Sequence, residues 1–347
     1  MISLEQHPFW ETLSALWSKG TSFLGCRYAI LGGAMTWVSD HRLVASISSS
    51  GGFGVLAGGA LFPEALDEEI RKTQELTLMP FGVNLIVFHH QIQDLVNVCI
   101  ERQVGHVFLG GGFPSPNVIE ALKAKNIRMI GFAPSVAVGK RLIKAGIDAL
   151  VLEGSEAGGH VGPVSTYVLA QEILPALEVP LFVAGGIGSG RGMLSYLWMG
   201  ASGCQLGTRF VCATESRAHP KFKEAFIKAN ARDATLSVQL DPRFPVIPVR
   251  ALENRGKQNF LNMQREVLDA YNQGMLSQKE AQMKLELFWA GALRRAVLEG
   301  DIEEGSLMAG QSVGMVKSIE PCEVIIHGMI EEMLQGLEAQ SQMGPKR

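Results

Sequence analysis

The sequence lacks the features that mark several broad classes of protein. It has five cysteines in 347 residues, and none forms a CxxC or a Cys/His cluster at metal-ligand spacing. We therefore expect reduced thiols and no metal site. No run of about twenty apolar residues is present, which predicts no membrane-spanning helix and no membrane partner. A formal net charge of −3 argues against a nucleic-acid partner.

The N-terminal segment also lacks the apolar run of a secretory signal. It carries Glu5, His7 and Glu11 at positions where such a signal would be apolar. The spacing of Phe9 and Leu13 favours an amphipathic helix instead. With the reduced thiols, this predicts a cytoplasmic protein.

Glycine, in contrast, is abundant, with 39 residues. Most lie beside eight apolar, strand-like runs: Tyr28–Gly33, Gly54–Gly59, Phe81–Leu85, His106–Gly112, Arg128–Pro134, Ala149–Gly154, Pro180–Gly186 and Gly203–Gly207. Six stretches compatible with helices separate them: Pro63–Thr77, Gln91–Gln103, Pro116–Lys125, Ala137–Ala145, Thr166–Ala176 and Arg191–Met199. Continuous apolar strands that alternate with helices are typical of a covered parallel sheet. Eight such units favour a (β/α)8 TIM barrel over a doubly wound open sheet, which strand counting does not exclude.

This rhythm breaks between about Cys212 and Gly291. Three polar helical stretches stand there instead, at Lys221–Ala231, Asn262–Gln273 and Lys279–Trp289. We therefore predict a barrel formed by residues 1–213 and 291–347, with a helical lid of residues 214–290 inserted after the eighth strand. A long helix from Glu320 to Gln340 would return to the barrel wall.

Candidate functional residues cluster where the predicted strands end. Residues 149–162 run from an apolar strand into a glycine-rich loop that carries Glu156 and His160. Histidine has the unperturbed pKa nearest to neutral pH, so His160 is a candidate general acid or base. The alternative is a surface histidine beside turn glycines. Glu156 fits an anchor for backbone or a cation better than a second acid.

The glycines after the last two predicted strands suggest a phosphate site. The loops after strands seven and eight of a TIM barrel recurrently bind phosphate through backbone N–H groups and a helix N-terminus. The candidates there are Gly185, Gly186, Gly207 and Thr208. His89 and His90 suggest a metal pair less well, because adjacent side chains on extended backbone point in opposite directions.

Several strings of this sequence resemble the nitronate monooxygenase (2-nitropropane dioxygenase) superfamily, in that family's order and over residues 25 to 330. They are Gly51–Gly54, Pro80–Asn84, Glu156–His160, Ala184–Ile187, Gly207–Phe210 and Ala309–Gln311. The likeness is greatest to the FMN-containing enoyl-acyl-carrier-protein reductases, on the residues Pro134–Ala137, Glu153–Gly154, His219–Pro220 and Gly305–Gln311. Nitronate monooxygenases share the histidine and phosphate loops, so both activities stay open.

The resemblance implies FMN over the barrel mouth, with its phosphate on the loops just described. Gly33, Ala34 and Met35 match a Gly-Gly-Met segment beside the isoalloxazine ring, with Ala34 in place of the second glycine. Asn84 is implied to hydrogen-bond the ring or ribityl chain, and its alternative role is a strand-end cap. The remaining implied residues are Gly158 and Gly159, which line the ring, and Gln311, which closes the site.

The same resemblance implies two chemistries for His160. In a reductase, NADH or NADPH supplies the hydride that reaches an enoyl thioester, and His160 or a water it orients protonates the product. In a nitronate monooxygenase, His160 orients or deprotonates the nitronate, and O₂ reoxidises the flavin. An NAD(P)H:quinone reductase is a variant of the reductase chemistry. The residues alone also allow a phosphate-binding barrel without redox chemistry.

Partners and lid contacts follow from weaker signals. The family implies a homodimer. A substrate carried on an acidic acyl carrier protein needs a basic face on the enzyme, and the candidate residues are Arg217, Lys221, Lys223, Lys228 and Arg232. In the lid, Phe244, Pro245 and Val246 are candidate substrate contacts, unless the insert is a purely structural cap. Arg250 and Asn254 match an Arg…Asn pair of the family that has no assigned role.

Overall fold

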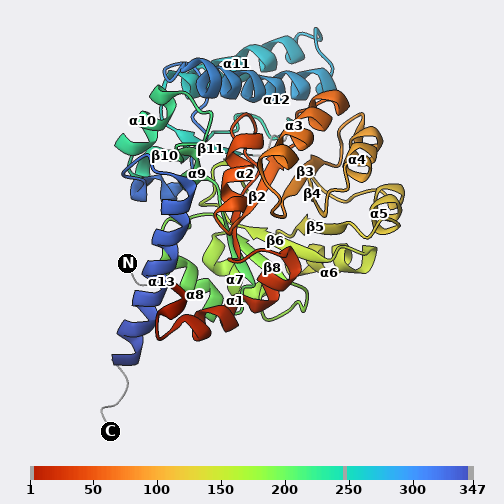
Figure 1. Cartoon of the computed structure of the whole chain (residues 1–347). Coiled ribbons are helices and arrows are strands. Elements are labelled where there is room, and N and C mark those ends of the chain that lie inside the picture. The colour runs from red at the N-terminus through yellow and green to blue at the C-terminus, as the bar shows by residue number, and fades with distance from the viewer. Residues whose placement is uncertain (1–3, 245–247, 343–347) are drawn as a thin grey trace.

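Eight parallel strands of the computed structural model close into a barrel (Figure 1). The structure describes residues 4–244 and 248–342. In spatial order the barrel strands are β1 (Ile30–Gly32), β2 (Phe53–Ala57), β3 (Gly82–Ile86), β4 (His106–Gly110), β5 (Arg128–Phe132), β6 (Ala149–Glu153), β8 (Leu181–Ala184) and β9 (Gly203–Leu206). Ile30 of β1 pairs with Cys204 of β9, which closes the ring. The predicted TIM barrel is confirmed, and the open sheet is wrong.

Helices between the strands cover the outside of the barrel. They are α2 (His41–Ser49), α3 (Pro63–Leu76), α4 (Ile92–Glu101), α5 (Pro116–Lys123), α6 (Val136–Ala145), α7 (Thr166–Ile173) and α8 (Gly190–Trp198). Helix α2 was not predicted; its N-cap is Asp40, whose carboxylate accepts a hydrogen bond from the Leu43 N–H. A short 3₁₀ turn (Leu4–Gln6) and α1 (Trp10–Leu24) precede the barrel, and α13 (Cys322–Gln342) packs against α8. Among the described residues, no helix is long and apolar enough to cross a membrane.

The alternation of side chains along each strand divides the barrel core into two layers. Inward-facing residues fill the barrel, and the largest of them are Phe53, Phe108 and Phe182. Outward-facing residues such as Val107 and Leu150 pack beneath the helices. Because the barrel is filled at its centre, the carboxyl ends of the strands are the place where a ligand can approach.

The insert adds a second layer at the carboxyl end of the barrel. Its elements are α10 (Pro220–Lys228), a 3₁₀ turn (Ala231–Asp233), β10 (Ala234–Leu236), β11 (Val249–Leu252), α11 (Arg255–Asn272) and α12 (Gln278–Arg294). The short helix α9 (Thr208–Val211) precedes the insert, and a π-helical turn (Arg295–Glu299) and a 3₁₀ turn (Gln311–Met315) follow it. Strands β10 and β11 form a small antiparallel sheet with β7 (Gly159–His160), the strand that follows β6. The sequence did not predict this sheet.

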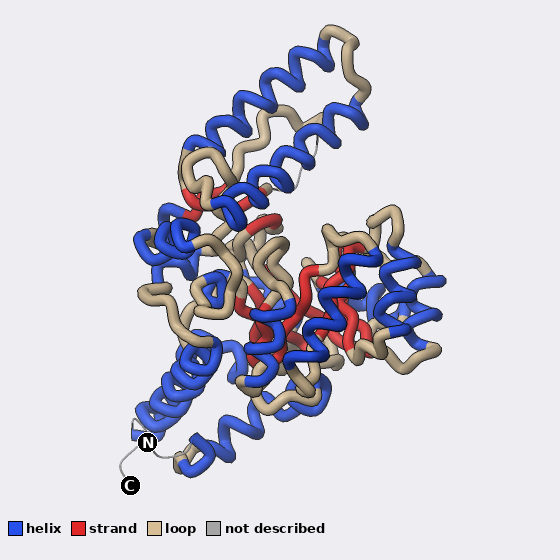
Figure 2. Tube along the Cα trace, turned by 45° about the horizontal axis from the view of Figure 1, so that its top comes forward, coloured by secondary structure: helices blue, strands red, loops and turns tan. Residues whose placement is uncertain are grey.

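The two ends of the insert pack differently. Helix α10 buries Phe222 and Phe226 in the same core as the barrel helices. Helices α11 and α12 instead form a hairpin that projects from the rest of the molecule (Figure 2). Together with β10 and β11, the hairpin forms a unit that we call the lid, whose core includes Phe260 and Trp289, and we call the sheet of β10, β11 and β7 the lid sheet. The domain division at residues 214 and 290 stays a prediction.

Candidate active site

The carboxyl ends of the barrel strands bring most of the predicted site residues to one mouth. Gly33 follows β1, Gly185 and Gly186 follow β8, and Gly207 follows β9. A Cβ atom added at Gly33 would lie 3.2 Å from the side chain of Gln205, and one added at Gly207 would lie 3.5 Å from Met35 Sδ. The loops after β1 and β9 are therefore in close contact.

The turn after β8 has the backbone that only glycine adopts easily. Gly185 and Gly186 have φ angles of 97° and 73°, in the left-handed region. A Cβ atom at Gly185 would lie 2.9 Å from Thr166 Oγ1, and one at Gly186 would lie 3.0 Å from Glu156 Cβ. Both positions therefore require glycine, and a glycine turn after the seventh barrel strand is a place where TIM barrels recurrently bind phosphate.

The start of α8 contributes less than the sequence suggested. Ser189 caps the helix by accepting from the Gly192 N–H. The Gly190 N–H donates to the Glu332 carboxylate of α13 at 2.7 Å, so its hydrogen is already engaged. The glycine turn, rather than the first amide of the helix, is the part that fits a phosphate.

Glu156 ties the loop after β6 to its surroundings. One of its carboxylate oxygens accepts hydrogen bonds from the Thr166 N–H at 2.8 Å and the Thr166 hydroxyl at 2.9 Å. Its backbone carbonyl accepts from the Gln311 N–H at 2.9 Å. The expected role as a backbone anchor is confirmed, and Gln311 lies at the site although it is far along the chain.

A returning segment, residues 309–311, completes this side of the mouth. The Gly310 N–H donates to the Thr208 hydroxyl at 2.9 Å. A Cβ atom at Gly158 would lie 2.7 Å from the Ala309 carbonyl carbon. Gly158, Thr208 and Gln311, which the sequence separates widely, thus meet at one place.

His160 is held on a strand and not in a loop, which corrects the prediction. It pairs with Val249 of β11, while Gly159 pairs with Arg250. Directly paired residues of antiparallel strands present their side chains on the same face. The His160 side chain therefore shares a face with Val249, a residue of the lid core. His160 itself is exposed, two residues after Gly158.

Asn84 lies across the barrel from these loops. It stands in the middle of β3, with its side chain directed inward by the strand alternation, and its Nδ2 donates to the Phe108 carbonyl at 3.4 Å. The alternative role as a strand-end cap is wrong. Ala34 is half-buried and packs against the barrel interior. Both side chains therefore lie on the inner side of the barrel.

Two residues with unusual surroundings were given no role from the sequence. Glu153 is the last residue of β6 and lies on the same inward face of the strand as Val151. Burial raises the pKa of its carboxyl to about 7. The strand alternation in the sequence was sufficient to place it inside. Trp37, after β1, has a φ of 67° and a buried Nε1 with no hydrogen-bond partner among the described residues. No sequence signal indicates this backbone.

Three weaker predictions are corrected. Phe244 is 3% exposed in the lid core and does not face the mouth, and Pro245 and Val246 lie outside the described residues. Lys223 is buried, and its Nζ donates hydrogen bonds to the carbonyls of Ala213 and Ser216. It is therefore not part of the predicted basic face. A buried ammonium must satisfy its donors within the protein.

His89 and His90 lie in a turn, and their rings stack with centroids 4.6 Å apart. The expectation that they point in opposite directions is wrong, because the backbone there is not extended. Within the described ranges, no group of three or more His, Cys, Asp or Glu side chains is arranged to hold a metal ion.

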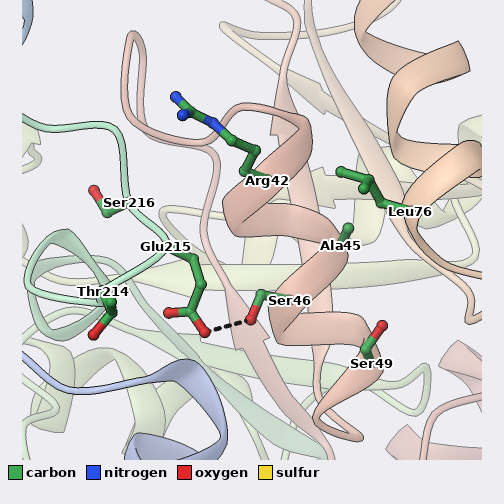
Figure 3. Close-up of a pocket in the computed structure, with 8 residues that line it drawn as sticks. All are labelled: Arg42, Ala45, Ser46, Ser49, Leu76, Thr214, Glu215 and Ser216. Atoms are coloured by element: carbon green, nitrogen blue, oxygen red, sulfur yellow. Dashed lines mark hydrogen bonds between the residues drawn. The ribbon is translucent and has the colours of Figure 1, made fainter.

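A separate cavity of about 420 Å³ lies outside the barrel, beside α2 and the loop after α9 (Figure 3). Arg42 and Ser46 of α2 line one side, and Glu215 accepts a hydrogen bond from the Ser46 hydroxyl at 2.7 Å. None of the predicted site residues lines this cavity. The barrel mouth therefore remains the candidate active site.

Comparison with known proteins connects this geometry to a family. The sequence profile described as nitronate monooxygenase matches residues 18–99 and 90–332. A Rhodococcus jostii protein named (3aS,4S,5R,7aS)-5-hydroxy-7a-methyl-1-oxo-octahydro-1H-indene-4-carboxyl-CoA dehydrogenase is 28% identical, over 94% of this chain and 98% of its own. A probable nitronate monooxygenase of Staphylococcus aureus is 27% identical, over 92% and 99%.

Among solved structures, FabK from Thermotoga maritima is similar over 93% of this chain and 97% of its own, with 35% identity and a TM-score of 0.83. A nitroalkane oxidase from Streptomyces ansochromogenes shares the fold over 92% of this chain and 99% of its own, with 23% identity and a TM-score of 0.75. With the family profile covering most of the barrel and the insert, the chain belongs to the nitronate monooxygenase family and is an oxidoreductase.

Proposed function

We propose that this protein is an FMN-dependent oxidoreductase that reduces an enoyl thioester with NADH or NADPH. The observation that carries the proposal is the meeting of two features at the carboxyl ends of β6 and β8, where a Cβ atom at Gly186 would lie 3.0 Å from Glu156 of the His160 loop. The glycine turn after β8 fits a phosphate, and β7 presents His160 from the lid side. A flat cofactor on the mouth would thus lie beneath a proton donor.

The residues proposed to hold FMN divide between its two ends. Gly185, Gly186, Gly207 and Thr208 would bind the phosphate, and Gln311 would close the site beside them. Gly33, Ala34, Met35, Asn84, Gly158 and Gly159 would contact the ring or the ribityl chain. The bound flavin supplies hydride transfer from the nicotinamide to the β-carbon of the thioester. His160 would then give a proton to the α-carbon, which completes a two-electron reduction of the double bond.

The relatives favour the thioester over other acceptors. FabK is an enoyl-acyl-carrier-protein reductase, and the identity to it is 35%. The identity to the probable nitronate monooxygenase is 27%. A third relative is named as a dehydrogenase of a carboxyl-CoA, itself a thioester. The second candidate is a nitronate monooxygenase, which the names of several curated relatives favour.

Partners are part of the proposal. Arg217, Lys221, Lys228 and Arg232 are exposed in and around α10 and are proposed as a basic face for an acidic acyl carrier protein. A homodimer is proposed from the family, and light scattering of the purified protein would test it. A cytoplasmic location is proposed from the free cysteines, four of which are buried.

The test is anaerobic reduction of the purified protein, followed in the visible flavin band. Bleaching by NADH or NADPH and return of colour on adding crotonyl thioester would support the reductase. Bleaching by an alkyl nitronate alone would replace it with the monooxygenase. A colourless protein that does not take up FMN would contradict both.

His160→Gln supplies the matched variant, because it keeps the size of the side chain and removes the acid. We expect flavin reduction by nicotinamide to persist and thioester reduction to fall about a hundredfold or more. An unchanged rate of thioester reduction would remove His160 from the chemistry.

A further inference from the structure

We propose that Arg250 is a positioning residue that holds the His160 segment, residues 155–161, against the lid sheet. Only the kinetic consequence of this proposal rests on the proposed function. The structural consequence concerns the chain's own backbone and needs no substrate.

The Arg250 guanidinium joins the barrel loop to the insert. Its Nε donates to the Ser155 carbonyl at 2.8 Å, and its Nη1 donates to the Ala234 carbonyl at 2.5 Å. Ser155 begins the His160 segment, and Ala234 begins β10. The residue is 7% exposed, so these bonds form away from water. A charged donor on a carbonyl is stronger than a neutral one, and more so when it is buried.

The backbone around Arg250 holds the other end of the same segment. Arg250 pairs with Gly159, Val249 pairs with His160, and the Val161 N–H donates to the Pro248 carbonyl at 3.0 Å. One short strand therefore contacts the segment at its end, and the Arg250 side chain contacts it at its start. Loss of the side chain would remove one of the bonds that hold the start of the segment, while the Glu156 bonds with Thr166 and Gln311 would remain.

The segment needs such support because of its own composition. Gly158 and Gly159 are adjacent, and Gly159 has a φ of 80°. Glycine backbone loses the most conformational entropy when it is ordered, so this stretch has little tendency to keep one shape by itself. His160 follows directly and takes its position from these two residues.

Charge also suits Arg250 to this place. Burial lowers the pKa of the guanidinium, and the nearby Glu156 carboxylate acts in the opposite direction. Glu156 is fixed by Thr166 at the start of α7. The buried cation thus lies near an anion of the segment that it holds, and a neutral replacement would remove this electrostatic attraction.

The experiment compares Arg250→Gln, Arg250→Lys and the control Arg255→Gln by hydrogen exchange of the full-length protein. Arg255 lies in the same insert but is 67% exposed, with ion-pair distances of 3.8 and 3.9 Å. In Arg250→Gln we expect amides of residues 155–161 to exchange at least about tenfold faster, because a buried charged bond is lost. Arg250→Lys should restore part of the protection, since its ammonium can reach one carbonyl. The control should match the parent protein.

Kinetics give the second readout. If His160 acts as proposed, Arg250→Gln should lower kcat about tenfold to a hundredfold through misplacement of the acid, with KM for the nicotinamide unchanged. Unchanged exchange in residues 155–161 would overturn the positioning role. An equal rise in exchange across lid and barrel would also overturn it, because Arg250 would then be a general stabilising residue. Absence of thioester turnover in the parent protein would contradict the proposed function and leave the exchange result standing.

Discussion

The barrel and the lid are built from the same kinds of residue but are held in different ways. Every barrel strand has two neighbours, and the interior is filled by residues from all around the ring. The lid has a smaller core of its own. It reaches the barrel through the β7–β11 pairing, the Arg250 bonds and Met308, which packs against both cores. The candidate site lies where the closed barrel meets the lid, so we expect its two sides to respond differently to damage.

The largest expected effect comes from truncating the barrel interior. Phe182→Ala should lower the free energy of unfolding by about 3–5 kcal/mol, because it removes a fully buried ring from a closed space that cannot collapse around the gap. Urea denaturation followed by far-UV circular dichroism measures this. A loss below about 1 kcal/mol would mean that the barrel interior closes around the space left by the ring.

The next largest effect is expected from lowering the pH, through His106 at the amino-terminal end of β4. Burial lowers the pKa of His106 to about 4, and nearby Arg128 adds to the effect, while the bond to the Phe23 carbonyl opposes it. The unfolded state then takes up the proton first, so stability is full above the unfolded pKa of 6.5 and falls as pH drops towards 4. We expect a loss of up to about 3 kcal/mol over this window.

His106→Gln is the control for this pH effect, because its amide can donate to the same carbonyl without titrating. The slope of stability against pH between 4 and 6.5 should flatten in this variant. An unchanged slope would assign the acid sensitivity to other groups.

A smaller effect is expected at the glycine turn after β8. Gly186→Ala places a side chain at a φ of 73° and should cost about 1–2 kcal/mol. FMN binding, measured by fluorescence titration, should weaken about tenfold as the turn shifts. Gly105→Ala is the matched control, since a Cβ there has open space. Equal effects at the two positions would remove the turn from the phosphate site.

The smallest effect on the barrel should come from the lid core. Phe260→Ala removes a ring as well buried as Phe182. We expect it to change the barrel's free energy of unfolding by less than about 0.5 kcal/mol, because distant sites act independently. Hydrogen exchange should nevertheless rise throughout α11 and α12. A barrel destabilised as much as by Phe182→Ala would show that lid and barrel unfold together.

The same contrast explains what could be predicted from the sequence. The barrel strands are local apolar runs, so each was visible by itself, and so were the glycines that follow them. Strand β7 has two residues and exists only because β11, some ninety residues later, pairs with it. Nothing within residues 149–162 indicates that pairing. The sequence therefore predicted that His160 follows the sixth barrel strand, but it did not predict that His160 pairs with β11.

Other misses have equally specific causes. Helix α2 is rich in serine, a weaker helix former, so its pattern was faint apart from the Asp40 cap. Phe244 stands in a polar, proline-containing stretch that suggests an exposed turn, yet it packs edge-to-face on Tyr271 with centroids 5.0 Å apart. Lys223 is charged and was assigned to the surface, but two backbone carbonyls satisfy it inside.

The bond from the Gly310 N–H to the Thr208 hydroxyl spans 102 residues of sequence, and this separation matters during synthesis. All eight barrel strands have been made by Leu206. At about 5–20 residues per second, the ribosome then needs on the order of ten seconds to add the segment that closes the mouth. For that time the nascent barrel carries an incomplete pocket, so a chain released early would have a closed barrel without a finished site.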